Sequence, residues 1–485
     1  MSLFGDHLRS LIDANKVNIY ALAKSSGLER TAIHKIISGD RIPTEEYVQK
    51  LSDALPLSPE ERQQLLESFS ISKVGEFKYR QRLQVKDIIE SITYIENTVN
   101  ANTSSGNVVN SPSMLTANTT AIGHFAVNNL IKSVIEETIT DAGKQEFDFV
   151  VSENYRYLYD ELLASYLRHP QLQIRHIVAF KKQTDFLNNS NRNLSLLSQV
   201  MPFAFAPGTV YYPYYYYGPS NDTELTQAMP YFILTSSDRL VLINKDFSKA
   251  AFISDKDVVA LYKESFDTML NQSKPLIKLL NSTFDFIIHV NELGSDNDSH
   301  CYWIEPEPCI SLIITDEIIE EYLRRDVPDR DIMLNLLRTH CEYYRSNQFR
   351  IINACTTDGL YRIINSGYVY NIPSELMTPF NRETIKQLLD TLRNKSEDGD
   401  ANVRIRFVNP SKIAVPKKTF LGISKKTGIN FIMHSKALTA GRAICVLEDS
   451  ITEAFWDFAE SLEDSGITYS ASDSLAMLNS IIDEL

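Results

Sequence analysis

The stretch ALAKSSGLERTAIHKIISGDRIP, residues 21–43, decides how the start of the chain folds. A short helical pattern ends at Gly27, a second begins within a few residues, and Gly39 ends the second. Glycine readily takes the positive φ angle that ends a helix and opens a tight turn. The sequence therefore predicts two short helices joined by a tight turn.

Helical patterns continue on both sides of this stretch. Asn18 can cap a helix that starts at Ile19, and isoleucines at 33, 36 and 37 form the buried stripe of the next helix. Ser58-Pro59-Glu60-Glu61 is a capping box with proline at the first helical position. We therefore expect an all-α domain of five helices at residues 1–70.

The order and spacing of these helices resemble the lambda-repressor-like, or XRE-family, DNA-binding domain. In such a helix-turn-helix the second helix enters the major groove with its first residues against the base edges. Carried over by position, the resemblance assigns base reading to Arg30, Thr31 and Lys35, with His34 nearby. It assigns contacts with the DNA backbone to Asn18, Ser38, Gly39 and Arg41. Arginine can grip guanine through two hydrogen bonds, and threonine offers its methyl group to thymine.

Two positions depart from the family pattern. Ile19 stands where glutamine is usual, which removes one phosphate contact, and Glu29 stands at the cap of the reading helix, where serine or threonine is usual. We expect basic residues at 73–86 to supply additional positive charge. The alternative is a helical bundle, or a degenerate domain, that does not bind DNA.

Composition limits the class of protein. The chain has 485 residues, more than one hydrophobic core normally organises, and a formal net charge of −14, which argues against a protein that coats nucleic acid. No apolar run is long enough to span a bilayer, and the N-terminus does not read as a secretory signal. The five cysteines lack C-x-x-C pairing, so we expect neither disulfides nor a zinc site, and a cytoplasmic location.

Beyond residue 70 the pattern predicts a helical extension at 71–95 and, because 96–120 is rich in Asn, Ser and Thr, a flexible linker. Alternating helices and strands follow, which we divide into αβ segments at 121–280, 281–375 and 376–485. FILTSSDRLVLINKD and FIMHSKALTAGRAICVLED both read as strand, turn, strand, followed by a helix. They indicate either an internal duplication or two unrelated hairpins.

The nearest candidate for a catalytic motif is His434-Ser435-Lys436, and it is incomplete. This H-x-K faintly resembles the motif of the phospholipase D superfamily, whose duplicated halves each carry His, Lys and Asp. Gly441 stands at the Asp position, and the aligned stretch of the first half, Thr235-Ser236-Ser237, has neither His nor Lys. We predict no catalytic residues, no cofactor and no metal.

Seven residues from Tyr211 to Tyr217 contain six tyrosines and one proline. Tyrosine supplies a large, fairly rigid apolar surface with a polar tip, which suits a ligand pocket. We therefore name Tyr214 and Tyr216, together with His434, as candidate ligand contacts. The alternative is a loop, broken by proline, that packs over the αβ core.

The sequence as a whole predicts a DNA-binding transcriptional regulator. Double-stranded DNA is the expected partner, and because one helix-turn-helix makes few base contacts we expect a homodimer. The αβ region is expected to bind a small-molecule or peptide ligand and to act on the DNA-binding domains through the linker at 96–120. The competing hypothesis is an enzyme or effector whose helix-turn-helix serves autoregulation or assembly.

Overall fold

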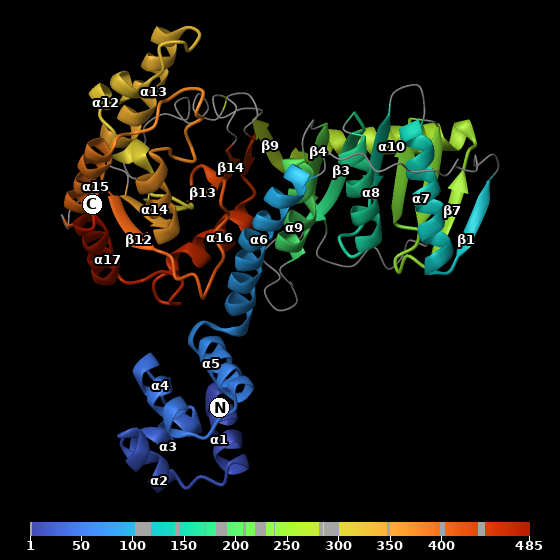
Figure 1. Cartoon of the computed structure of the whole chain (residues 1–485). Helices are drawn as coiled ribbons and strands as arrows, with labels where there is room; N and C mark the ends of the chain where they lie inside the picture. Colours follow the sequence, from blue (N-terminus) through green and yellow to red (C-terminus); the bar gives the residue numbers. More distant parts are fainter. Residues whose placement is uncertain are drawn as a thin grey trace. The chain divides into compact units, whose positions relative to one another are not determined.

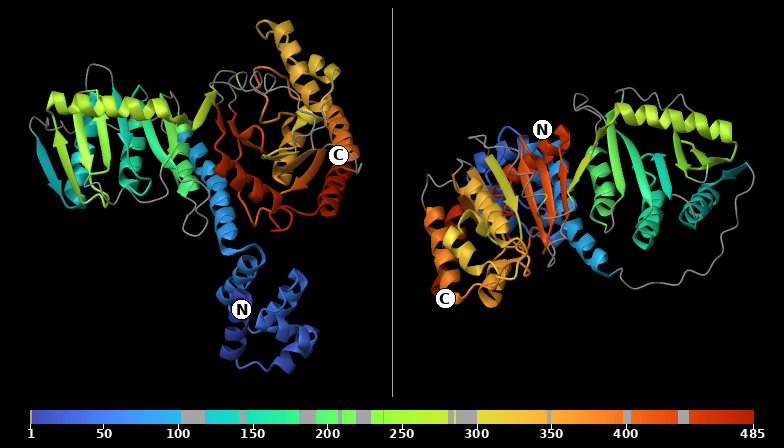
Figure 2. Two further views of the ribbon diagram at one scale, coloured as in Figure 1. Left: turned by 180° about the vertical axis from the view of Figure 1, so that it is seen from behind. Right: turned by 90° about the horizontal axis from the view of Figure 1, so that it is seen from above.

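The computed structural model divides the chain into an N-terminal unit, Met1–Gln84, and a C-terminal unit, Val85–Leu485 (Figures 1 and 2). The structure describes residues 2–101, 118–140, 145–169, 171–180, 192–206, 210–218, 229–236, 238–280, 285, 300–346, 350–397, 403–434 and 442–485. Within these ranges, no helix is both long enough and apolar enough to cross a bilayer.

The N-terminal unit is all-α, as predicted. Its five helices are α1 (Leu3–Ala14), α2 (Ile19–Ser26), α3 (Arg30–Ser38), α4 (Glu45–Ala54) and α5 (Pro59–Val74). The predicted capping box is present: Ser58 accepts from the Glu61 backbone N–H, and the Glu61 carboxylate accepts from the Ser58 N–H. A core of buried leucine, isoleucine, valine and phenylalanine side chains holds the five helices together.

Helix α6 (Glu76–Ala101) follows directly, and its residues are divided between the two units. This corrects the predicted start of the linker, because residues 96–101 are helical and the chain re-enters regular structure at Thr119. Residues 102–117 of the predicted linker lie outside the described residues. Buried isoleucines of α6 at 88, 89, 92 and 95 belong to the core of the C-terminal unit, which explains why the helix continues.

The first half of the C-terminal unit is an eight-stranded mixed sheet in the order β1-β7-β6-β5-β2-β3-β4-β8. Its strands are β1 (Thr119–Ile122), β2 (Glu146–Val150), β3 (Gln173–Phe180), β4 (Tyr211–Tyr217), β5 (Tyr231–Thr235), β6 (Arg239–Ile243), β7 (Lys249–Ile253) and β8 (Lys274–Pro275). Its helices are α7 (His124–Thr140), α8 (Arg156–Arg168), α9 (Arg192–Phe205) and α10 (Lys256–Gln272). Helices α7 to α9 share one core with the sheet and α10 packs in another, on the opposite face (Figure 2).

The second half is a seven-stranded mixed sheet in the order β12-β11-β10-β13-β14-β15-β9. Its strands are β9 (Ile277–Leu280), β10 (His300–Ile304), β11 (Arg350–Cys355), β12 (Val403–Phe407), β13 (Thr419–Ser424), β14 (Gly428–Met433) and β15 (Arg442–Val446). Its helices are the 3-10 turn η2 (Ile310–Leu312), α12 (Asp316–Tyr322), α13 (Arg330–Ser346), α14 (Thr357–Ser366), α15 (Arg382–Glu397), α16 (Asp449–Glu460) and α17 (Ala471–Asp483). The predicted segments 281–375 and 376–485 therefore form one sheet and not two separate parts.

The two sheets share one topology. Strands β2, β3 and β4 run parallel in order, β5 lies antiparallel beside β2, and β6, β7 and β1 follow antiparallel. The same pattern holds for β10, β11 and β12, then β13, β14, β15 and β9. The repeat of seven strands in one order supports an internal duplication over two unrelated hairpins.

The duplication aligns differently from the sequence-based pairing. Hairpin β5–β6 corresponds to β13–β14 and not to β14–β15. Asp255 caps α10 and Glu448 caps α16. Both carboxylates accept from backbone N–H groups of the first turn, where negative charge is favoured.

Candidate nucleic-acid interface

The turn between α2 and α3 is formed as the glycine positions predict. Gly27 ends α2 with φ of 69° and Gly39 ends α3 with φ of 81°, both in the left-handed region. The Asn18 side chain caps α2 by accepting from the Tyr20 backbone N–H at 2.8 Å. Each of these residues fixes one end of a helix, so the length of the reading helix is set locally.

Helix α3 is held by its buried face and by a close approach of α1. Ile33, Ile36 and Ile37 lie in the core of the unit. A Cβ atom at Gly5 of α1 would lie 2.6 Å from the Ile36 carbonyl oxygen and 2.8 Å from that of Ile37. Only glycine lets the two helices approach this closely, so Gly5 helps to set the position of α3.

The outer face of α3 carries the predicted base-reading residues. Arg30, Thr31, His34 and Lys35 are all exposed, while the intervening residues are buried. The Thr31 hydroxyl donates to the Glu29 carboxylate at 3.4 Å, and Glu29 itself makes no side-chain cap bond. The structure therefore gathers the four side chains on one exposed face of a helix, as the resemblance implies.

The predicted backbone contacts lie at the ends of the two helices. Asn18 is exposed at the start of α2, and Ser38 and Arg41 are exposed after α3. The Ser38 hydroxyl lies 2.6 Å from an Asp40 carboxylate oxygen, and the Arg41 guanidinium stacks 5.0 Å from the centre of the Tyr47 ring. Ile19 packs against the core, so the helix uses this position for packing, where the family pattern has a polar contact.

Charge is distributed unevenly over the N-terminal unit. Glu45, Glu46 and Asp53 of α4 pair with Lys73, Lys50 and Arg62, respectively. Around the predicted interface, by contrast, Arg30, Lys35 and Arg41 have no ion pair within the described part of the unit. These three cations are therefore available to phosphate.

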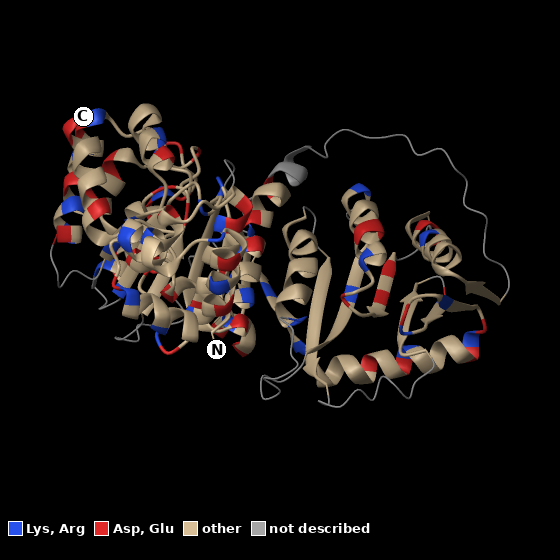
Figure 3. Ribbon diagram, turned by 90° about the horizontal axis from the view of Figure 1, so that it is seen from below, with Lys and Arg blue, Asp and Glu red and all other residues tan. Residues whose placement is uncertain are grey.

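The basic segment at 73–86 contributes less than predicted. Lys73 binds Glu45 at 2.9 Å, Arg80 binds Glu76 at 2.6 Å and Lys86 binds Glu90 at 3.1 Å. Basic and acidic residues are interspersed along the helices of the molecule (Figure 3). Because these carboxylates neutralise Lys73, Arg80 and Lys86, the segment supplies less additional positive charge than its sequence suggests.

One further interface candidate is not among the predicted residues. The Tyr20 side chain is 66% exposed on the first turn of α2, next to Asn18. A phenol at this place can donate a hydrogen bond to a phosphate oxygen. The sequence signal for this contact is a large aromatic residue two positions after a helix cap, which periodicity alone interprets as a packing residue.

The predicted ligand contacts do not form one site. Tyr214 and Tyr216 lie on β4, which is a strand and not the proline-broken loop of the alternative, and both pack against the core beneath α10. His434 follows β14 in the second half and lines a separate pocket beside α13. The three residues therefore belong to two places in the C-terminal unit.

The H-x-K comparison also changes. Arg239 pairs with Thr235 and Gly428 with Ser424 across turns of equal length, so His434 corresponds in register to Lys245. Of the predicted counterpart, Thr235-Ser236-Ser237, Thr235 ends β5 and Ser236 follows it, before β6 begins. Ser435, Lys436, Gly441 and Ser237 lie outside the described residues, and no group of three metal-binding side chains occurs within them.

Comparison with known proteins identifies one part of the chain. Residues 8–62 match the family model described as helix-turn-helix. No curated protein matches the chain. Three solved structures are similar in part, at sequence identities that bear on the fold alone and with low TM-scores.

The first is TrmBL2, an archaeal chromatin protein with a novel mode of DNA binding, at 11% identity and a TM-score of 0.22, covering 56% of this chain and 98% of that one. The second is polyphosphate kinase from Porphyromonas gingivalis, at 9% identity and a TM-score of 0.23, covering 76% of this chain and 56% of that one. The third is phosphatidylserine synthase from Haemophilus influenzae Rd KW20, at 9% identity and a TM-score of 0.24, covering 76% of this chain and 92% of that one. Residues 8–62 are therefore a helix-turn-helix domain of the lambda-repressor-like class, and the chain is, in coarse terms, a DNA-binding regulator.

Proposed function

We propose that the chain is a sequence-specific transcriptional regulator in which α3 reads the major groove and the C-terminal unit senses a signal and dimerises. The observation that carries the proposal is the exposed face of α3. It presents Arg30 and Lys35 without competing carboxylate partners among the described residues, on a helix fixed by Gly5, Gly27 and Gly39.

A mobility shift on the DNA upstream of the protein's own gene tests this proposal. Arg30→Ala and Lys35→Ala should each weaken binding, because a good contact to a base is worth about 1–3 kcal/mol. Arg9→Ala is the matched control: it removes the same charge from an exposed position of α1. Equal binding by all four proteins would overturn the assignment of α3.

The signal is proposed to travel through α6 and not through a linker at 96–120. Helix α6 runs from Glu76, directly after the helix-turn-helix, into the core of the C-terminal unit. The Glu96 carboxylate is buried there and accepts hydrogen bonds from the backbone N–H groups of Lys417 and Lys418 and from the Thr419 hydroxyl. A change at the start of β13 thus acts directly on the helix that leads to the DNA-binding domain.

Dimerisation is proposed to use the free edge of the first sheet. Strand β1 is the last strand of that sheet, and Ile122 and Phe125 beside it are 75% and 81% exposed. Its topological counterpart β9 is not free, because it contacts β4 of the first half. The repeat therefore uses this edge for packing in one half, whereas in the other no described strand pairs with it, which suits a second copy of the chain.

The proposal assigns no catalysis to the C-terminal unit. His434 is the histidine of the H-x-K, and the residue in register with it in the first half is Lys245, so a paired histidine is missing from that position. Incubation of the protein with bis(p-nitrophenyl) phosphate, a chromogenic phosphodiester, tests this part. Release of nitrophenol that is lost in His434→Ala would favour the competing enzyme hypothesis.

A further inference from the structure

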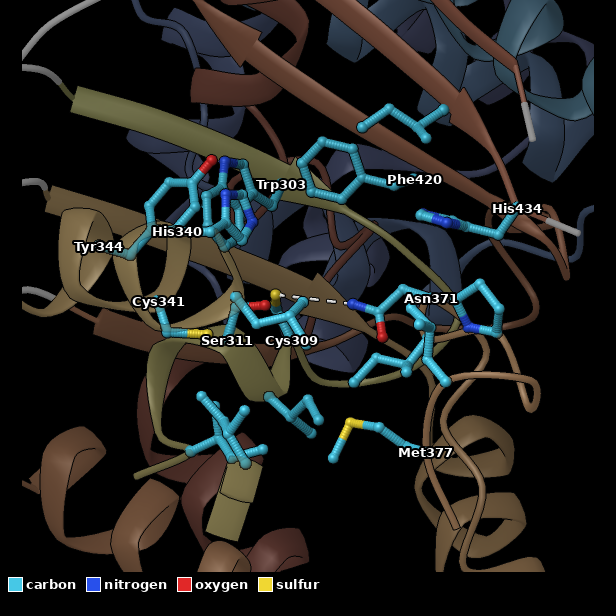
Figure 4. A pocket seen from close by; sticks show the side chains of 18 residues that line it. Trp303, Cys309, Ser311, His340, Cys341, Tyr344, Asn371, Met377, Phe420 and His434 are labelled. Atoms are coloured by element: carbon cyan, nitrogen blue, oxygen red, sulfur yellow. Dashed lines mark hydrogen bonds between the residues drawn. The ribbon is translucent and has the colours of Figure 1, made fainter. Parts of the chain in front are cut away.

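A pocket lies in the second half, between the sheet and the helices that follow β10 (Figure 4). Its volume is about 90 Å³, of the same order as the roughly 150 Å³ cavity that admits benzene. Helices α12 and α13 have no counterpart in the first half, where α8 alone joins β2 to β3. The pocket is therefore a feature of the second half that the duplicated scaffold does not itself require.

The walls of the pocket are largely aromatic. Trp303 meets Tyr344 edge to face at 5.0 Å between ring centres and Phe420 at 5.4 Å. Figure 4 shows His340 beside Trp303 and Tyr344, and His434 on the other side of the pocket near Asn371. Aromatic walls of this kind favour a flat ring that can stack or meet their edges.

Two histidines that line the pocket each carry one ring nitrogen without a partner among the described residues. The Nδ1 atoms of His340 and His434 are buried and have no hydrogen-bond partner among the described residues. Burial lowers the pKa of His340 to about 4 and that of His434 to about 3, so both imidazoles are neutral near pH 7. A buried polar atom without a partner costs free energy, which a ligand that bonds to it recovers.

No Asp, Glu, Lys or Arg is found among the described residues that line the pocket. The Asn371 amide contributes only a long contact of 4.0 Å to the Cys309 sulfur. A charged ligand would lose its hydration without gaining an opposite charge. Size, aromatic walls and the two neutral imidazoles together define an uncharged ligand with one ring and at least one hydrogen-bonding group.

We propose that this pocket binds a small, uncharged, single-ring aromatic molecule that bears a hydrogen-bonding group, and that the molecule is the signal sensed by the chain. The role as a signal rests on the proposed regulatory function, whereas the binding does not. Phe420 forms part of the wall, and its neighbour Thr419 donates to Glu96 of α6 at 2.7 Å. A ligand that displaces Phe420 would therefore also shift Thr419, the next residue on β13, and with it the hydrogen bond to α6.

Calorimetric titration of the full chain without DNA tests the binding. The probes are phenol, benzene, which lacks the hydrogen-bonding group, and benzoate, which adds a charge. Phenol should bind at least tenfold more tightly than benzene, and benzoate should give no heat of binding. No binding of phenol or benzene would overturn the proposal, and tighter binding of benzoate would overturn the uncharged class.

Variants locate the site. His340→Leu and His434→Leu remove the two unpaired nitrogens and should lower phenol affinity about tenfold, while benzene affinity stays the same. The substitution removes a buried nitrogen that has no partner, so the Tm of each variant should not fall. A variant that fails to fold would be recognised by a lowered or absent thermal transition. Equal affinities for phenol in these variants and in the parent would overturn the role of the histidines.

The two tryptophans of the chain give a second readout. Trp456→Phe leaves Trp303, in the pocket wall, as the sole tryptophan, and its emission should change on titration with phenol. Trp303→Phe, which leaves Trp456, should show no such change.

A mobility shift with and without phenol tests the role of the ligand as a signal. If the protein binds no DNA with or without phenol, the proposed regulatory function is contradicted. If it binds DNA equally with and without bound phenol, only the coupling between the pocket and DNA binding is contradicted.

Discussion

The Glu96 carboxylate accepts a hydrogen bond of 2.7 Å from the Thr419 hydroxyl, although the two residues are 323 positions apart in the chain. The same carboxylate accepts from the backbone N–H groups of Lys417 at 3.0 Å and Lys418 at 2.9 Å. Glu96 is 4% exposed and lies near the end of α6. This carboxylate therefore joins the helix that follows the DNA-binding domain to the central hairpin of the second sheet.

Glu96→Ala should destabilise the C-terminal unit by about 3 kcal/mol, because it leaves three donors without an acceptor. The measurement is the unfolding transition in differential scanning calorimetry, together with hydrogen exchange of residues 85–101. Glu90→Ala is the matched control, since Glu90 is less buried, accepts one backbone bond of 2.9 Å from the Ala414 N–H and pairs with Lys86 at 3.1 Å, and its loss should cost about 1 kcal/mol. Similar losses for both variants would contradict the anchoring role of Glu96.

Gly5→Ala should destabilise the N-terminal unit, although alanine is normally better than glycine inside a helix by about 1 kcal/mol. The reversed sign follows from the distances of 2.6 Å and 2.8 Å between the added Cβ and the carbonyl oxygens of Ile36 and Ile37. We expect a loss of about 1–3 kcal/mol in chemical denaturation and weaker DNA binding. Ser10→Ala, on the exposed part of α1, is the control and should leave both unchanged.

The short-range features of the N-terminal unit could be predicted because each is encoded locally. A left-handed glycine ends α2 and another ends α3, Asn18 and Ser58 cap their helices, and the buried isoleucines repeat at helical spacing. The exposed positions of α3 follow from that spacing. The basic segment at 73–86 could not be assessed this way, because its ion pairs include one to Glu45, far away along the chain.

The C-terminal unit was less accessible to prediction because its order is set by contacts between distant residues. Pro213 suggested a loop, but β4 tolerates it, because β8 pairs only with Tyr214 and Tyr215 and the Pro213 carbonyl still accepts a bond of 2.9 Å from the Leu276 N–H, which requires no N–H of proline. His434 was named from its motif alone. The residues that share its pocket come from β10, α13 and β13, among other elements, and no local sequence pattern predicts that they lie together.

Glu305 should make the stability of the C-terminal unit depend on pH. Burial raises its pKa to about 8, against the lowering effect of hydrogen bonds donated by Tyr370 and Asn353. The folded state then holds a proton that the unfolded state releases at lower pH, so the free energy of unfolding falls as pH rises from about 4.5 to 8. The slope for one proton is at most about 1.4 kcal/mol per pH unit.

Glu305→Gln should remove this part of the slope, which urea unfolding at a series of pH values measures. Glu307→Gln is the comparison. Burial raises the pKa of Glu307 to about 7, so its effect should end about one pH unit earlier. A parent protein and a Glu305→Gln variant with parallel profiles between pH 4.5 and 8 would contradict the assignment.

Arg30 and Lys35 should differ in the kind of DNA binding that each supports. Lys35→Ala, if the amine contacts phosphate, should weaken binding to all sequences and reduce the slope of log K against log salt by about 0.9. Arg30→Ala, if the guanidinium reads guanine, should relax preference at one base pair in addition. Selection of binding sites from random DNA, repeated at two salt concentrations, separates the two. Unchanged base preference in Arg30→Ala would remove it from the base-reading set.

Phe125→Glu should convert a dimer into a monomer, because it places a charge on the most exposed aromatic ring beside the free edge of β1. Leu261→Glu is the matched control: Leu261 is 63% exposed on α10, on a different surface of the same half, and its substitution should leave the dimer intact. Sedimentation velocity measures the outcome, and binding to a single half-site should persist in both variants. A dimer that survives Phe125→Glu, or that is lost equally in Leu261→Glu, would show that the second copy does not dock on this edge.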